Sequence, residues 1–137
     1  MSKIHSHYKN NIYIFHMFDF TLLISAIIFV TIDYFYLNII KDYFERQVQA
    51  VQGSPLKINF LGVIMCYIIL IFGLNYFIIK PKRSIQDAFL FGLIIYGVYE
   101  TTNLALFSKW SWLTVLIDSL WGGVLFALTT WILRQFL

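Results

Sequence analysis

Residues 58–79 read INFLGVIMCYIILIFGLNYFII, a run that contains no charged side chain. About 20 consecutive apolar residues, each rising about 1.5 Å in an α-helix, cross a hydrocarbon core about 30 Å thick. Three more apolar runs reach this length, at residues 20–40, 85–107 and 113–133. Because lipid offers no hydrogen bonds to the backbone, each run is predicted to be a helix despite its many Ile, Val and Phe residues.

The composition indicates the same class of protein. The chain has 137 residues, of which 60% are hydrophobic and 12% are charged, whereas soluble domains have about 45–50% apolar and about 25% charged residues. We therefore predict an all-α integral membrane protein, a multi-pass four-helix bundle whose partner is the lipid bilayer. Residues 18–137 are expected to form this single domain, and residues 1–17 a polar and aromatic N-terminal tail.

The segments between the runs support this division. Residues 80–83 and 108–112 are short connections, and Ser84–Asp87 has the pattern of a capping box that opens the third helix. The connection at residues 41–57 has no helix breaker before Gly53, so it is expected to continue the first helix or to lie on the membrane surface.

Four crossings place both termini on the same side of the membrane. Six lysines and arginines flank the predicted helices on that side and four on the other, which favours cytoplasmic termini. The formal net charge is +3, without a basic cluster suited to nucleic acid, so no nucleic-acid partner is predicted.

Other residue types give weaker signals. The single cysteine, Cys66, excludes a disulfide within the chain, and the spacing of His5 and His7 does not favour a metal site. The sequence names no cofactor.

Three acidic residues lie well inside the predicted helices. Counted along alternating helices, Asp33, Glu100 and Asp118 all lie roughly 8–11 Å below the membrane face opposite the termini. An ionised acid near a helix centre costs about 2.5–3.5 kcal/mol, and no lysine, arginine or histidine lies in the runs to pair with it. The acids must therefore hold protons, bind a cation or face a hydrated cavity.

Helical spacing adds further residues to this candidate ligand- or ion-binding site. The residues that share a helix face with an acid, at steps of three or four, are Tyr36, Tyr96, Asn103 and Trp121. The helix at 58–79 has no acid and is expected to be the most lipid-exposed. Tyr67 within it is interpreted as a packing residue.

Three spaced motifs resemble those of a known family. They are Asp33–Leu37, similar to Asp-x-x-Trp-Leu, Tyr96–Asn103, similar to Tyr-Gly-x-Tyr-Asp-x-Thr-Asn, and Asp118–Gly122, which matches Asp-x-x-Trp-Gly. The family is the predicted membrane proteins called domain of unknown function 2177, and the resemblance extends over about residues 18–133. It implies four spans and the same acids, with Tyr36 in place of a tryptophan and Glu100 in place of an aspartate. It implies no activity.

Three functions remain open at this point. The acids could bind or pass protons or cations, in which case a pore would require a homo-oligomer because four helices make a narrow bundle. They could serve a membrane-embedded enzyme that acts on a lipid, although the short chain has no nucleophile motif and no basic phosphate clamp at that depth, which disfavours an enzyme. They could also have a structural or assembly role, by holding helices together through hydrogen bonds.

Overall fold

The computed structural model describes the backbone of residues 2–136 and the side chains of residues 20–136. Four α-helices and one π-helical turn follow one another as α1 (Ser2–Gln52), α2 (Phe60–Leu74), η1 (Asn75–Ile79), α3 (Ile85–Leu106) and α4 (Trp112–Leu133). Four segments are long and apolar enough to cross a membrane, Phe20–Gln52, Phe60–Ile79, Ile85–Leu106 and Trp112–Leu133. The predicted all-α fold with four spans is confirmed.

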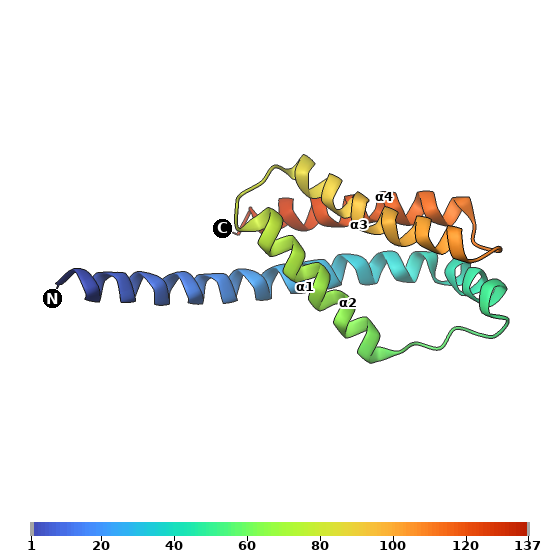
Figure 1. Ribbon diagram of the computed structural model, residues 1–137, viewed down its shortest axis with the longest axis horizontal. Helices are drawn as coiled ribbons and strands as arrows, with labels where there is room; N and C mark the ends of the chain where they lie inside the picture. The colour runs from blue at the N-terminus through green and yellow to red at the C-terminus, as the bar shows by residue number, and fades with distance from the viewer. Residues whose placement is uncertain (1, 137) are drawn as a thin grey trace.

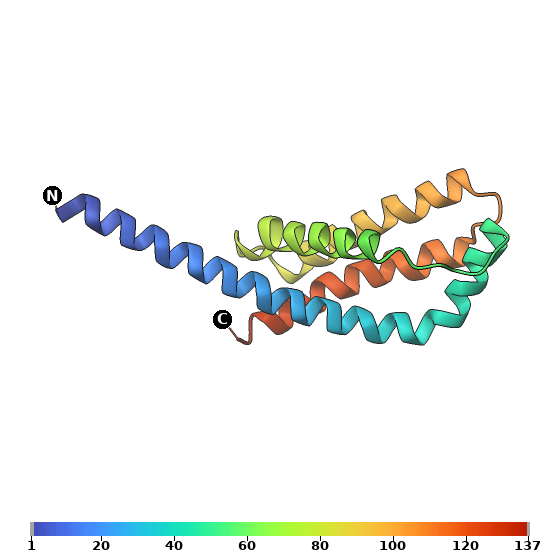
Figure 2. The same ribbon diagram turned by 90° about the horizontal axis from the view of Figure 1, so that it is seen from below.

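The first helix is much longer than a bilayer is thick. With 51 residues, α1 extends for about 75 Å. It includes the backbone of the predicted tail, and it continues through residue 52 as expected for part of the long connection. Its last part turns away from the axis of the part before it (Figure 2). The helix ends at Gly53, where a φ of +72° favours glycine.

The closest pair of helices is α3 and α4, which run antiparallel side by side (Figure 1). The capping box predicted for α3 is present, because Ser84 and Asp87 each accept from the other's backbone N–H. A Cβ added to Gly92 on α3 would overlap the carbonyl group of Gly122 on α4, and one added to Gly122 would overlap the Tyr96 ring. The absence of side chains at both positions therefore lets the two helices approach closely.

The second helix crosses α1 obliquely (Figure 1). Its first half presents large side chains outward, and Phe60 is 74% exposed, as expected of a lipid-facing surface. Its second half turns inward, where Leu70, Ile71 and Leu74 are buried. The expectation that this helix is the most lipid-exposed is wrong, because 28% of its most apolar stretch is buried, compared with 17% for α1 and for α3.

The π-helical turn η1 follows α2 directly. The Lys80 N–H donates to the Asn75 carbonyl at 2.8 Å, and the Asn75 side chain donates to Ser25 Oγ on α1 at 2.7 Å. Asn75 and Ser25 are almost completely buried. This hydrogen bond therefore fixes η1 against α1 near the end of the bundle where the described chain begins and ends (Figure 1).

Candidate functional site

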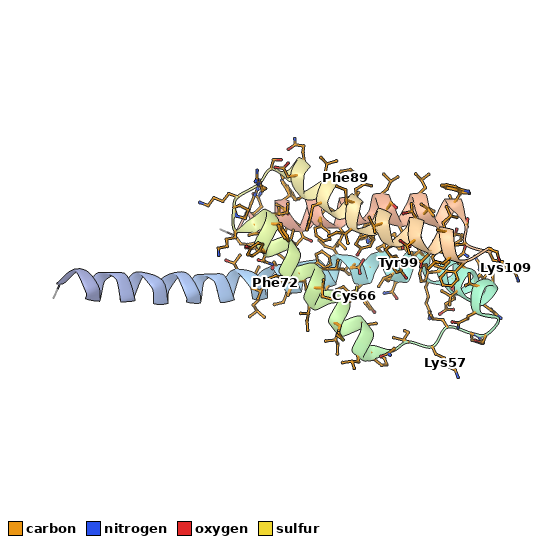
Figure 3. The ribbon with its side chains drawn as sticks, viewed as in Figure 1. Lys57, Cys66, Phe72, Phe89, Tyr99 and Lys109 are labelled. Atoms are coloured by element: carbon orange, nitrogen blue, oxygen red, sulfur yellow. The ribbon has the colours of Figure 1, made fainter. Side chains whose placement is uncertain are left out.

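Asp33 lies at the centre of a contact between three helices. Its side chain is buried on α1, in register with the buried Phe29 one turn before it. The Tyr67 hydroxyl of α2 donates to Asp33 Oδ2 at 2.6 Å, and the Trp121 indole of α4 donates to Oδ1 at 2.8 Å. Tyr67 follows Cys66, which is labelled midway along α2 in Figure 3. Both carboxylate oxygens of Asp33 thus accept from neutral donors on other helices.

Asp118 is joined to the same group through Tyr36. The Tyr36 hydroxyl donates to Asp118 Oδ1 at 2.5 Å. The Tyr36 ring also stacks on the Trp121 ring, with centroids 4.1 Å apart and planes 9° from parallel. In this stacked pair, the Trp121 indole therefore donates to Asp33 and the Tyr36 hydroxyl donates to Asp118.

Glu100 of α3 completes the group and is fully buried, with 0% of its surface exposed. The Trp110 indole, from the connection between α3 and α4, donates to Glu100 Oε2 at 2.8 Å. The carboxyl groups of Glu100 and Asp118 interact electrostatically. Among the residues whose side chains are described, no donor reaches Glu100 Oε1. Because an ionised carboxylate only accepts hydrogen bonds, two neighbouring carboxylates repel each other unless one of them carries a proton.

Trp110 itself is held by aromatic rings. It is 9% exposed, and the rings of Phe44 on α1 and Phe107 lie 6.3 Å and 6.2 Å from it. This packing turns the indole inward, toward a carboxyl group ten residues earlier in the chain.

Five of the seven sequence-predicted residues come together in this network. Tyr36 and Trp121 link Asp118 to Asp33, and Glu100 interacts with Asp118. Tyr96 and Asn103 share a helix with Glu100 but do not donate to the acids. The Tyr96 ring lies against Gly122, and Asn103 Nδ2 is buried without a hydrogen-bond partner.

Two donors were missed by the sequence reasoning. Tyr67 was interpreted as a packing residue, and Trp110 lies in a segment interpreted only as a short connection. Tyr67 lies near the middle of its helix, at a depth from which a long side chain reaches Asp33, so depth was an available signal. For Trp110 the sequence held no signal, because Trp112, the same residue type two positions later, is 74% exposed.

The chemistry of the network is that of acids with neutral donors. In the part of the chain whose side chains are described, the one salt bridge joins Lys41 and Glu45, far along α1 from the acids. In that same part no three His, Cys, Asp or Glu side chains are grouped so as to hold a metal ion.

The helices and this network define a class, that of multi-pass integral membrane proteins with polar groups buried between their spans. The family model described as "Predicted membrane protein (DUF2177)" matches residues 18–134. The chain therefore belongs to this family, as its three motifs indicated. Neither the curated proteins nor the solved structures give a match.

Proposed function

We propose that the Glu100–Asp118 carboxyl pair binds a proton inside the membrane and exchanges it, so that the protein works as a proton-binding or proton-passing membrane protein. The observation that carries the proposal is the interaction of two carboxyl groups, one of them fully buried, that form no salt bridge with any residue whose side chain is described. Two adjacent carboxylates in a medium of low dielectric repel each other, so the pair is more stable with one proton than with none.

A proton fits this environment better than a metal cation. Three of the carboxylate oxygens already accept from a hydroxyl or indole hydrogen at 2.6–2.8 Å, on Asp33 and Glu100, and Tyr36 donates to a fourth on Asp118. These hydrogens carry partial positive charge and already lie on the carboxylate oxygens that a metal cation would need as ligands. A proton shared between Glu100 and Asp118 needs no such set of ligands.

Infrared difference spectroscopy on the protein in lipid nanodiscs tests proton binding directly. A protonated carboxyl group has a carbonyl band that ionised carboxylates lack. We expect this band in the parent protein and its loss in E100Q and in D118N. In D87N the band should remain, because Asp87 is a helix cap outside the network. A parent spectrum without the band, or variants that keep it, would refute the proposal.

Passage of protons is a separate measurement. In liposomes that contain a pH-sensitive dye, the parent should dissipate a pH gradient faster than D118N does. If the carboxyl band is present but the two proteins dissipate the gradient equally, the protein binds protons without conducting them.

A structural role is the second candidate, and one observation favours it. The hydrogen bonds of Asp33 join α1 to α2 and to α4, that of Asp118 joins α4 to α1, and that of Glu100 joins α3 to the α3–α4 connection. Interhelical hydrogen bonds in membranes stabilise a fold by about 0.6–1.7 kcal/mol each. A purely structural network predicts that D118N lowers the unfolding temperature while no protonated carboxyl is detected in the parent.

A further inference from the structure

The two sides of the carboxyl network differ in chemistry. Toward the end of the bundle where the described chain begins and ends lies an apolar layer, made of the fully buried side chains of Phe29, Leu74, Leu125 and Phe126. The rings of Phe29 and Phe126 meet edge to face with centroids 5.2 Å apart. These four side chains have no group that hydrates a proton, so they separate the acids from that side of the membrane. The buried polar side chains at this end, Ser25, Asn75, Thr129 and Thr130, lie beyond them along their helices.

Toward the opposite end the buried groups are polar. Thr114 lies one helical turn before Asp118 on α4 and is 2% exposed. Its hydroxyl donates to Gln47 Oε1 at 3.1 Å, and the Tyr43 hydroxyl lies 2.8 Å from Thr114 Oγ1. Gln47 Nε2 in turn donates to the Lys109 carbonyl at 2.8 Å. We call these three side chains, Tyr43, Gln47 and Thr114, the α1 latch.

The latch holds the last part of α1, which carries Tyr43 and Gln47, against α4 and the α3–α4 connection. Gln47 holds the backbone of Lys109, the residue before Trp110, whose indole covers Glu100. Lys109 and Lys57 lie at this end of the molecule (Figure 3). Beside the latch is an open cavity of about 180 Å³, lined by Val51, Leu106, Phe107, Ser108 and Lys109. Water at this end therefore comes close to the latch from outside.

From these contacts we infer that the last part of α1 is a lid, and that the carboxyl pair exchanges protons with the membrane face opposite the chain ends when the latch opens. The inference rests on the proposed function, since it describes access to the same pair. A lid held by side-chain hydrogen bonds opens locally without unfolding the bundle. The apolar layer keeps the other side closed throughout.

The titratable groups around the pair are acids, phenols and one thiol. Asp33 and Tyr36 face it from α1 and Tyr96 from α3, whereas Tyr67 on α2 donates to Asp33 and Cys66 beside it is exposed. Tyr43 belongs to the latch. The charged residues on the last part of α1 are Lys41, Asp42, Glu45 and Arg46, and Lys109 lies on the connection that Gln47 contacts.

Deuterium exchange of the protonated carboxyl band, followed by infrared spectroscopy in nanodiscs, tests the lid. In Q47A the latch loses two hydrogen bonds, so exchange should be about tenfold faster or more. T114V should act in the same direction, and T114S, which keeps the hydroxyl, should restore the parent rate. Q49A is the matched control, because Gln49 lies on the same part of α1 but is exposed.

A variant beyond the apolar layer tests whether protons exchange with only one face of the membrane. Thr129 is fully buried on α4 beyond the apolar layer, so T129V should leave the exchange rate unchanged. Backbone amide protection in α2 should also stay constant in Q47A, which separates local opening from general loss of stability. Unchanged or slower exchange in Q47A, or faster exchange in T129V, would overturn the inference. A parent without the carboxyl band would instead refute the proposed function itself.

Discussion

Replacing Trp121 by phenylalanine isolates one hydrogen bond of the network. The ring at position 121 still stacks on Tyr36, but Asp33 Oδ1 loses the indole donor at 2.8 Å. An interhelical hydrogen bond in a membrane is worth about 0.6–1.7 kcal/mol, and a buried acceptor left without a donor costs about 1–3 kcal/mol. We expect a loss of about 1–2 kcal/mol, which lowers the unfolding temperature by about 4–8 °C for a chain of this size.

Thermal unfolding in detergent, followed by circular dichroism, measures this loss. The matched control is W131F, because Trp131 lies on the same helix and is 51% exposed. Its change should stay within about 0.5 kcal/mol. A double-mutant cycle with D33L tests the partner, since the effect of W121F should shrink by about 1 kcal/mol once the acceptor is gone. Equal losses in W121F and W131F, or additivity with D33L within about 0.5 kcal/mol, would refute the assigned contact.

Two further substitutions test the packing around the network. G92A should destabilise the fold by about 1–3 kcal/mol, because its Cβ overlaps the Gly122 carbonyl group, whereas G97A should be nearly neutral since its nearest neighbour, Ser119 Oγ, would lie 3.7 Å away. Equal unfolding temperatures for the two variants would contradict the close approach of α3 and α4. Y67F should lower stability by about 0.6–1.7 kcal/mol through loss of the bond to Asp33, while Y76F, at a 51% exposed position, should not. A loss in Y76F as large as that in Y67F would argue against this bond.

The fold could be predicted from run length because lipid leaves a hydrophobic run few alternatives. A span without water must satisfy its own backbone, so the Ile- and Val-rich run at residues 58–79 is helical in the structure as well. Depth counting along alternating helices also placed Asp33, Glu100 and Asp118 at one level, and the structure joins them. Both predictions depend on rise per residue, which is nearly constant in helices.

What could not be predicted depends on how helices tilt and rotate. The oblique crossing of α2 over α1 brings Tyr67 to Asp33, and tilt is set by packing rather than by the length of a run. Tyr96 shares a helix face with Glu100 through its spacing of four residues, but that spacing does not fix what the ring contacts. In the structure the Tyr96 ring lies against Gly122, where α3 and α4 approach closely.

The distribution of polar groups links protonation to the position of the lid. Under the proposed function, loss of the proton from the Glu100–Asp118 pair leaves two charges that the surrounding phenols and indoles solvate only in part. Water is the remaining source of solvation, and the apolar layer of Phe29 and Phe126 closes one approach. The ionised pair is therefore more stable with the α1 latch open, whereas the protonated pair tolerates the closed lid. By linkage, a change that favours opening must also favour release of the proton. Q47A should accordingly weaken proton binding at the pair as well as accelerate exchange, and the carboxyl band should disappear at a lower pH than in the parent.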